Sequence, residues 1–438
     1  MLLTAREAAL IQLNAFREKG LQSGSGVEKL NTEYGLNEKD SALAVNIFLG
    51  CIQYLYRLDF CIAAVSDIPA GKIDGCVMNI LRVSAYQLFF LERIPAHAAV
   101  DEGVKLCRKY RPRACAFVNA VLRRLSSVRK ALPEPAGDAP FKLSVLYSVA
   151  EWFAAYLVER YGLDSAEAFL KESNNRAPLS IKINSLRIAP DEYRELLTRN
   201  EIPFRNYAYD DILFIDSRDV KGLPGFSEGF FFVQDPAAAA CTAISGIAPG
   251  MRVLDACSSP GGKAFSAAAA MKNKGCILAC DINSKKTAKI VEGAERLGMS
   301  SIMCSECDAK KYNAEFESAF DVVIADVPCS GFGVLRKKPE IKYKSRKEIA
   351  ALPEIQNAIL DNLCRYVRPG GTLLYSTCTV LKEENEQVVE RFLTGHGAFR
   401  AADFDCCGIR SVDGMYTFLP HVNGTDGFFA AKLVRTCI

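Results

Sequence analysis

The sequence predicts a multidomain protein that joins an all-helical N-terminal domain, a small α+β module and a C-terminal α/β domain. The chain has 438 residues, about three times the ~150 residues expected of one domain. Prolines and glycines interrupt it at residues 133–140, as in a linker. From residue 237 onward, apolar strand patterns and helical patterns alternate. Half of the residues are hydrophobic and 24% are charged, which excludes disordered, collagen-like and coiled-coil chains.

The first 132 residues show helical periodicity. Thr4 and Glu7 have the spacing of a capping box, a common start of a helix. Apolar residues at helical spacing follow it, and similar runs continue at residues 43–56, 80–91 and 117–125. No alternating strand pattern of comparable length occurs here. We therefore expect residues 1–132 to form an all-helical domain.

The next segment, residues 141–236, mixes two periodicities. Helical patterns cover residues 149–161 and 190–199, and strand patterns cover residues 179–184, 212–215 and 230–234. Interleaved helices and strands of this kind are typical of a small α+β module.

The C-terminal segment, residues 237–438, predicts a Rossmann-like α/β domain in which strands and helices alternate strictly. Strands are expected at residues 252–257, 276–282, 322–327 and 372–377, with helices at 263–271 and 285–297. Nearly continuous apolar strands are typical of a parallel sheet that helices cover on both faces. Ligands of such sheets bind at the carboxyl ends of the strands.

The net charge of +3 is small, but basic residues gather in one window. Between Glu102 and Glu134 there is no acidic residue. The basic residues of that window are Lys105, Arg108, Lys109, Arg111, Arg113, Arg123, Arg124, Arg129 and Lys130. Such a block suggests a footprint for a phosphate backbone, and the alternative is a solvated helix face.

Composition also bears on the cellular compartment. No uncharged apolar stretch reaches the ~18 residues of a membrane span, and Arg6 and Glu7 follow too soon for a signal peptide. The 17 cysteines are odd in number and spread evenly, which indicates reduced thiols. We expect a cytoplasmic protein without a membrane segment.

A glycine turn follows the first strand of the α/β domain. Asp255 ends that strand, and the turn consists of Cys257, Ser258, Ser259, Pro260, Gly261, Gly262 and Lys263. It is neither a Walker loop, because Ala264 stands where Ser or Thr is needed, nor a G-x-G-x-x-G loop. A tight glycine turn at this place lets a ligand approach the backbone closely, but alone it is weak support for a ligand site.

Two carboxylates follow the next strands. Asp281 comes 19 residues after Gly262, where an acid can accept both hydroxyls of an adenosine ribose. Asp308 follows the next apolar run and could receive an adenine amino group. Ribose and adenine contacts without a pyrophosphate loop favour S-adenosylmethionine over NAD. The alternative for either aspartate alone is a helix cap.

Cys329 and Cys378 each follow a predicted strand, in Asp326-Val-Pro-Cys329 and Tyr375-Ser-Thr-Cys378. Both would therefore face the crevice at the carboxyl edge. Most other cysteines lie in apolar runs, and either of these two alone could also be a small core residue. A metal site is not expected, because Cys304 and Cys307 lack a second pair. The three histidines, His97, His396 and His421, have no ligand spacing.

A methyltransferase can use such thiols on a pyrimidine. Carbon 5 of the ring is not nucleophilic until a thiolate adds to carbon 6, which is covalent catalysis. A carboxyl group at ring N3 would stabilise the charge that develops, and Asp326 is the candidate. The proton on carbon 5 must then leave, and a second cysteine beside the first can serve that step.

These residues together resemble the Nol/Nop/Sun family of RNA cytosine-5 methyltransferases. The matching segments include the turn from Asp255 to Lys263, the motifs around Cys329 and Cys378, and the acidic residues Asp281 and Asp308. They also include Val233-Gln-Asp-Pro236, Glu383-Glu-Asn-Glu386 and Asp426-Gly-Phe-Phe429. Residues 99–105 and 117–124 of the helical domain resemble a NusB-like RNA-binding domain. Members that carry this fusion methylate 16S ribosomal RNA.

The resemblance implies a role for each site residue. Cys378 would be the nucleophile and Cys329 would assist product release, with Asp326 beside them. The methyl donor would be held by Cys257, Ser258, Ser259, Pro260, Gly261, Gly262, Lys263, Asp281, Asp308 and Asp326. The partner would be 16S ribosomal RNA and the cofactor S-adenosylmethionine. Nothing in the sequence suggests an obligate dimer, so we expect a monomer. Ser258, Ser259, Ala264 and Thr379 depart from the family's usual residues, which are Ala, Ala, Thr and Ser.

Alternatives remain open at this point. The same chemistry could act on transfer RNA or on another ribosomal RNA, or the two cysteines could exchange roles. A different class of function is a non-catalytic NusB-like RNA-binding or antitermination factor. Beyond Cys329, a basic run is expected to line the RNA entrance or to form a solvated loop. Its members are Arg336, Lys337, Lys338 and Lys342.

Overall fold

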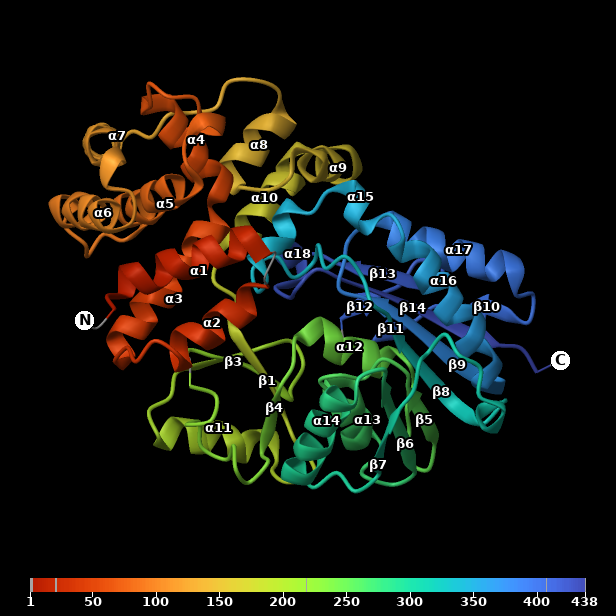
Figure 1. Ribbon diagram of the computed structural model, residues 1–438. Helices are drawn as coiled ribbons and strands as arrows, with labels where there is room; N and C mark the ends of the chain where they lie inside the picture. Colours follow the sequence, from red (N-terminus) through yellow and green to blue (C-terminus); the bar gives the residue numbers. More distant parts are fainter. Residues whose placement is uncertain (1–2, 20–21, 218, 407, 438) are drawn as a thin grey trace. The chain divides into compact units, whose positions relative to one another are not determined.

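The computed structural model describes residues 3–19, 22–217, 219–406 and 408–437 (Figure 1). The chain forms two compact units. The first comprises Met1–Asn175 together with Leu335–Arg346, and the second comprises Arg176–Val334 with Lys347–Ile438. The predicted division at residues 132, 141 and 237 does not follow these units, and the three-domain boundaries stay a prediction.

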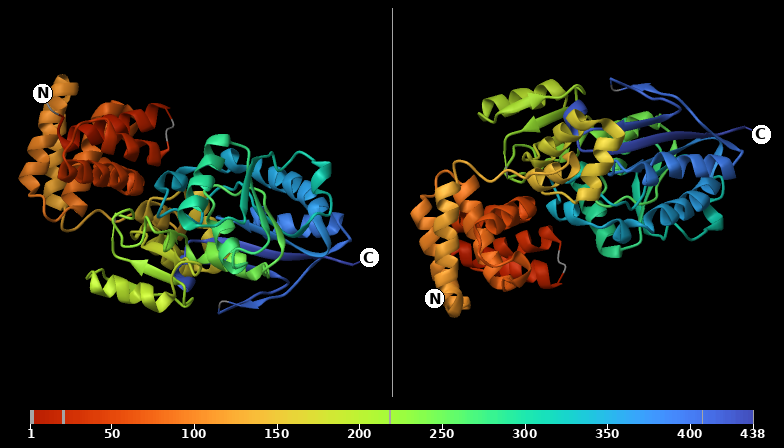
Figure 2. Two further views of the ribbon diagram at one scale, coloured as in Figure 1. Left: turned by 90° about the horizontal axis from the view of Figure 1, so that it is seen from below. Right: turned by 90° about the horizontal axis from the view of Figure 1, so that it is seen from above.

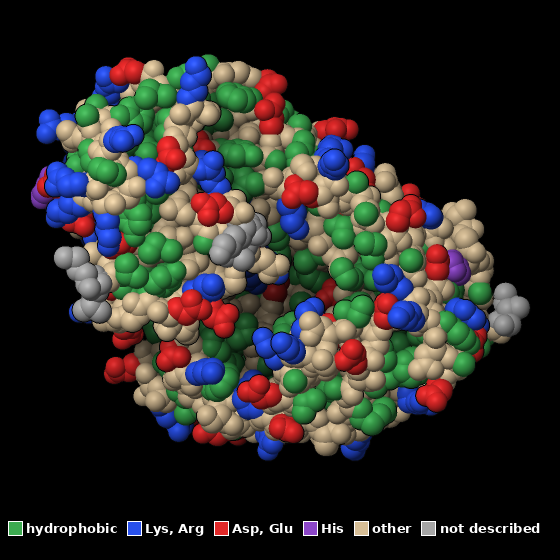
Figure 3. All heavy atoms as spheres, in the orientation of Figure 1, with side chains coloured by type: hydrophobic (Ala, Val, Ile, Leu, Met, Phe, Trp, Pro, Cys, Tyr) green, Lys and Arg blue, Asp and Glu red, His purple; other side chains and the backbone are tan. Residues whose placement is uncertain are grey.

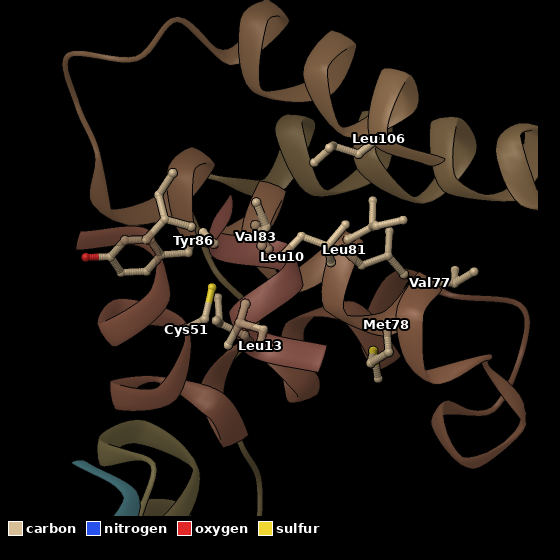
Figure 4. Packing of buried hydrophobic residues seen from close by; sticks show 14 of the residues in the cluster. Leu10, Leu13, Cys51, Val77, Met78, Leu81, Val83, Tyr86 and Leu106 are labelled. Carbon is tan, nitrogen blue, oxygen red and sulfur yellow. The ribbon is translucent and has the colours of Figure 1, made fainter. Parts of the chain in front are cut away.

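The first unit is helical, as its periodicity predicts. Its helices are α1 (Ala5–Lys19), α2 (Ser23–Thr32), α3 (Glu38–Gln53), α4 (Leu55–Val65), α5 (Gly75–Phe90), α6 (Ala96–Tyr110), α7 (Cys115–Val128), α8 (Ala139–Tyr147), α9 (Glu151–Tyr161) and α10 (Leu163–Asn174). Four of these helices have a side-chain cap at the N-terminus: Thr4, Asn37, Asp74 and Asp138 accept backbone N–H groups of the first turn. The central helix α5 is buried nearly all round, and Leu81 and Val83 pack there against Leu10 (Figure 4).

A segment from the C-terminal half of the sequence completes this unit. Leu335–Arg346 contains the short 3-10 helix η4 (Pro339–Tyr343). The Lys342 side chain is only 1% exposed. Its Nζ donates to the carbonyl oxygens of Gln53 (3.1 Å) and Tyr147 (3.3 Å) and contacts Asn174 Oδ1. Burial lowers the pKa of Lys342 to about 7.

This placement corrects the expectation that the basic run lines an RNA entrance. Lys342 is a buried structural residue. The Arg336 side chain is 3% exposed and pairs with Glu172 at 3.5 Å. Only Lys337 and Lys338 are exposed among the four. Sequence could not reveal this, because the partners lie 168 to 289 residues away from Lys342.

The second unit begins with the small α+β module. Its antiparallel sheet has the strand order β2-β3-β1-β4. The elements are β1 (Leu179–Ile183), α11 (Pro190–Arg199), β2 (Phe204–Asn206), β3 (Ile212–Ile215) and β4 (Phe231–Val233). Helix α11 covers one face of this sheet (Figures 1 and 2), and its Tyr193 and Leu197 pack against Ile181 and Leu213 of the strands.

The large sheet of the second unit has the order β10-β14-β9-β8-β5-β6-β7, with β13 paired to β14. Its parallel strands are β5 (Arg252–Asp255), β6 (Cys276–Asp281), β7 (Ile302–Glu306), β8 (Phe320–Asp326) and β9 (Val367–Thr377). The antiparallel strands are β10 (Phe399–Ala401), β13 (Met415–Phe418) and β14 (Phe428–Arg435). The α/β class is confirmed. The predicted strict alternation of strands and helices is wrong between β7 and β8, where only the 3-10 helix η3 (Ala314–Phe316) lies, and after β10.

Helices cover both faces of this sheet, as the apolar strands predict. The helices α12 (Pro236–Ile244), α13 (Gly262–Ala270) and α14 (Ser284–Leu297) share one hydrophobic core with the sheet. The helices α16 (Leu352–Leu363) and α17 (Glu386–Gly395) share another. The chain reverses direction across the sheet between β5 and β8, a switch point at which ligands bind.

Within the described ranges, no single helix is long and apolar enough to cross a membrane. Helices α3 and α4 meet that test only when taken together, and they are bent by 78°.

Candidate active site

The turn after β5 places backbone at the carboxyl edge of the sheet. Ser258 N donates to Cys280 O at 2.7 Å, and Gly261 N donates to Ser258 O at 2.7 Å. Gly261 has φ +104°, and a Cβ atom there would lie 2.6 Å from the Phe265 ring. Only glycine fits this position. The turn is therefore shaped to let a ligand lie close to its backbone.

Asp255 at the end of β5 is completely buried and accepts a hydrogen bond of 2.8 Å from Ser258 Oγ. Burial raises the pKa of Asp255 to about 7, although Ser258 and Lys263 oppose the shift. Ser258 stands where the family usually has alanine, and its hydroxyl donates to Asp255 Oδ2. The other carboxylate oxygen, Oδ1, is left without a donor in the described part of the chain.

A cavity of about 280 Å³ lies between the ends of β5 and β6 and the segments that follow β7. Its apolar walls include Leu254, Ala256, Phe316 and Leu363, and Asp308 provides a carboxylate. Apolar walls with a few polar groups are typical of a small-molecule site. The residues present fit an adenine ring.

The structure does not support the alternative that these aspartates are helix caps. Asn283 caps α14, because its side chain accepts from Lys285 N. Among the described residues, the Asp281 side chain accepts a hydrogen bond only from Asn283 N, at 3.1 Å, and it lies 3.6 Å from Lys286 Nζ. Asp308 accepts from Lys310 N in a turn.

The two cysteines predicted to share the crevice are in contact. Cys329 Sγ lies 3.0 Å from Cys378 Sγ, and Cys378 N lies 3.3 Å from Cys329 Sγ. The hydrogen bond to Cys378, burial, and the charges of Cys378 and Glu384 raise the pKa of Cys329 well above its usual value. With its pKa raised, Cys329 favours the thiol form, which can donate a hydrogen bond to Cys378 Sγ.

Asp326 is held at both oxygens beside these loops. Its Oδ2 accepts from Lys263 Nζ at 2.7 Å, and its Oδ1 accepts from Ser376 Oγ at 2.9 Å. Lys263 is 7% exposed and lies 4.8 Å from the centre of the Phe428 ring. Burial lowers the pKa of Lys263, but the charge and hydrogen bond of Asp326, together with Cys241 and Asp255, outweigh burial and the net shift is upward. Lys263 thus follows the glycine turn in sequence and also forms an ion pair with Asp326.

In the folded helical unit, acidic side chains from outside residues 103–133 lie next to several basic residues of the window. Four of its members form ion pairs, namely Lys105 with Glu102, Lys109 with Glu7, Arg111 with Asp74 and Arg124 with Asp67. The other five, Arg108, Arg113, Arg123, Arg129 and Lys130, are exposed and have no ion pair among the described residues. Basic and acidic side chains are accordingly interspersed on the face in Figure 3. The footprint available for phosphates is smaller than the sequence suggests.

Two buried polar residues near the cysteines have no predicted role. Gln356 lies on α16, and Glu384 lies in the short 3-10 helix η6 (Lys382–Glu384). Both contact the loop of Cys329. The run Glu383-Glu-Asn-Glu386 is visible in the sequence, but nothing in it shows which loop these side chains hold. No group of three or more metal-ligating side chains is found in the described part of the chain.

Three family models match this chain. A model described as 16S rRNA methyltransferase RsmB/F matches residues 246–434, the NusB family matches residues 3–127, and an RsmF/B-like ferredoxin-like domain matches residues 149–220. The last match identifies the small antiparallel module as ferredoxin-like.

Curated relatives match over nearly the whole length. The ribosomal RNA small subunit methyltransferase B of Pseudomonas putida is 33% identical, covering 91% of this chain and 92% of its own. The probable ribosomal RNA small subunit methyltransferase B of Bacillus subtilis is 31% identical, covering 98% of each. Among solved structures, PH0851 has a TM-score of 0.81 at 23% identity and covers 99% of both chains, which shows the shared fold.

Proposed function

The chain belongs to the RsmB/F family of 16S ribosomal RNA methyltransferases, and we propose that it methylates carbon 5 of a cytosine in 16S ribosomal RNA. The methyl donor of this family is S-adenosylmethionine. The observation that carries the proposal is the 3.0 Å contact between Cys329 Sγ and Cys378 Sγ, beside an Asp326 whose carboxylate is fixed at both oxygens.

The donor would be held by the glycine turn and the acids of neighbouring strands. Cys257, Ser258, Ser259, Pro260, Gly261 and Gly262 form the turn, with Asp281 at the ribose and Asp308 at the adenine cavity. Lys263 and Asp326 close the site on the side of the base. When bound, S-adenosylmethionine supplies an electrophilic methyl group.

Cys378 is the proposed nucleophile. Its thiolate, hydrogen-bonded by the Cys329 thiol, adds to carbon 6 of the cytosine and makes carbon 5 nucleophilic. Asp326 would lie near ring N3 and hold Lys263 Nζ beside it at 2.7 Å, so that the positive charge of the lysine stabilises the negative charge that develops on the ring. Carbon 5 then takes the methyl group, and Cys378 is left as a neutral thioether.

Cys329 is the proposed base of the release step. Once Cys378 is a thioether, its charge no longer raises the pKa of Cys329, so Cys329 can lose its proton to solvent. The Cys329 thiolate then takes the proton from carbon 5, the carbon 6–sulfur bond breaks, and its electron pair returns to Cys378. One thiol and one thiolate are restored, and one proton is released for each methyl group transferred.

The partner and the setting are also proposals. 16S ribosomal RNA is the substrate in this account, and the NusB-like region supports ribosomal over transfer RNA. We further propose that the chain acts as a monomer in the cytoplasm, where thiols stay reduced. None of the cysteines in the described ranges forms a disulfide.

The test is methyl transfer from labelled S-adenosylmethionine to naked 16S ribosomal RNA, with transfer RNA and 23S ribosomal RNA as comparison substrates. Bisulfite sequencing of the product then locates the modified base. A single protected cytosine in 16S RNA is expected. Incorporation into transfer RNA instead would keep the chemistry and overturn the substrate. Donor binding without incorporation into any RNA would favour a non-catalytic RNA-binding factor.

A further inference from the structure

The loop that carries Cys329 is held from both sides of the cysteine by buried polar side chains. Before it, Pro328 O accepts from Gln356 Nε2 at 3.0 Å. After it, Ser330 N donates to Glu384 Oε2 at 2.9 Å. Gln356 Nε2 also donates to Glu384 Oε2 at 2.8 Å. One amide and one carboxylate therefore fix the backbone on both sides of Cys329.

These groups are out of contact with solvent. Gln356 and Ser330 are 0% exposed, and Glu384 is 2% exposed. Gln356 Oε1 has no hydrogen-bond partner among the described residues, which is unfavourable for a buried amide. A buried glutamine with an unsatisfied oxygen is retained more readily where its N–H groups are needed. An apolar side chain would otherwise suit this position of α16.

The same turn also holds the loop that carries Cys378. Asn385, next to Glu384, donates to Thr379 O at 3.0 Å, and its Oδ1 accepts from Thr377 Oγ1 at 2.6 Å. Ser330 Oγ and Thr379 Oγ1 lie 2.9 Å apart and join the two loops directly. Thr379 thus keeps the hydroxyl that the serine usual in the family would supply. The 3.0 Å contact of the two sulfur atoms is therefore fixed by both backbones.

We propose that Gln356 and Glu384 are positioning residues for product release, which hold Cys329 where it can take the carbon 5 proton. This inference rests on the proposed roles of the two cysteines. Neither residue is expected to matter for the addition of Cys378 to carbon 6, because Cys378 follows β9 directly and is held by Asn385 instead. Loss of the clamp should therefore slow release and spare addition.

The Glu384 charge supports the same role in the resting enzyme. Together with the hydrogen bond to Cys378 and burial, it raises the pKa of Cys329. The Cys329 thiol then stays protonated beside Cys378 until addition has occurred. A Cys329 that is misplaced by loss of the clamp would no longer reach the proton on carbon 5 in the release step.

The experiment separates the two steps with full-length protein, S-adenosylmethionine and 16S RNA, followed as protein–RNA adduct on a denaturing gel. Gln356→Met removes both N–H bonds at almost equal volume. We expect adduct to form within about 3-fold of the wild-type rate and to decay about 10-fold or more slowly. Asn357→Leu is the matched control, because within the described ranges the side chain of this buried neighbour on α16 donates only to Pro353 O, in its own helix. It should leave both rates unchanged.

Ser330→Ala is the second variant and guards against misfolding of Gln356→Met. It removes the hydroxyl link to Thr379 and keeps the N–H bond to Glu384, so we expect adduct decay about 3-fold slower. If Gln356→Met and Ser330→Ala slow formation as much as decay, the role is structural and the proposal fails. Cys329→Ala and Cys378→Ala report on the proposed function separately. If Cys329→Ala accumulates adduct but Gln356→Met and Ser330→Ala do not, only the positioning role is overturned.

Discussion

Lys263 in the α/β unit and Lys342 in the helical unit are both buried, at 7% and 1% exposure, yet their environments are opposite. Lys263 faces the Asp326 carboxylate at 2.7 Å, and its pKa is raised. Lys342 faces two backbone carbonyls and an asparagine oxygen, and its pKa falls to about 7. Negative groups around Lys263, with Asp326 first among them, together outweigh the loss of water around its ammonium group, whereas the neutral oxygens around Lys342 do not.

The opposite pKa shifts of Lys263 and Lys342 reflect different uses of buried polar groups in the two units. The α/β unit pairs Lys263, at the start of α13, with Asp326 at the end of β8, and it brings together the two cysteines that we propose act on the substrate. The helical unit satisfies its buried amine with uncharged oxygens, so that Lys342 anchors a segment without offering a charge to a ligand. The groups around a buried lysine, rather than the lysine itself, thus decide whether its pKa is raised or lowered.

The largest effect should come from removing the charged member of this pair. Lys263→Met leaves Asp326 without its counter-charge, and we expect kcat/KM for methyl transfer to fall at least about 100-fold. Lys342→Met, the matched change in the helical unit, should keep methyl transfer within about 3-fold while the protein is folded. Initial rates with labelled donor measure both. Equal losses of kcat/KM in Lys263→Met and Lys342→Met would contradict the different roles proposed for the two lysines.

The lowered pKa of Lys342 predicts that the stability of the helical unit depends on pH. Between pH 7 and about 10 the unfolded chain holds a proton on this amine that the folded unit does not hold, so stability rises with pH. The free energy of unfolding of wild type relative to Lys342→Met should increase by about 2 kcal/mol from pH 7 to pH 9. The chain has one tryptophan, Trp152, in α9 of the helical unit. Its fluorescence in urea therefore reports on this unit, and a pH-independent difference would contradict the lowered pKa.

The smallest effect tests the exposed charges of the helical unit. Arg123→Gln with Arg129→Gln removes two cations that have no ion pair in the described part of the unit, and we expect RNA affinity to fall about 3- to 10-fold. The slope of log affinity against log salt should also become shallower. Lys105→Gln with Arg124→Gln changes charges that already pair with Glu102 and Asp67, so their loss should matter less. Binding to 16S RNA at several salt concentrations measures this, and equal losses would refute the distinction.

The place of the glycine turn and the contact of the two cysteines could be predicted from sequence because parallel strands bring their carboxyl ends to one edge. A residue that follows each strand then lies in the same crevice wherever the helices pack. This reasoning placed Cys329 next to Cys378 and placed Asp326 beside them. It also placed Asp308 at the cavity.

The rest depends on contacts between distant residues that no local pattern reveals. The basic run after Cys329 looked like a substrate entrance, but Lys342 is buried against Gln53, 289 residues away. Gln356 reaches Glu384 across 28 residues, and the antiparallel strand β14 pairs with β9 although the preceding pattern was parallel. The basic window contains no acidic residue, but Lys109 and Arg111 pair with Glu7 and Asp74, which lie outside the window.

The central claim is that Cys378 adds to the base and Cys329 releases it. The most direct measurement compares Cys329→Ala and Cys378→Ala, each incubated with 16S RNA and S-adenosylmethionine and then run on a denaturing gel. The account predicts a stable protein–RNA adduct for Cys329→Ala and none for Cys378→Ala, with methyl transfer lost in the latter. Adduct in Cys378→Ala and none in Cys329→Ala would contradict it and exchange the two roles.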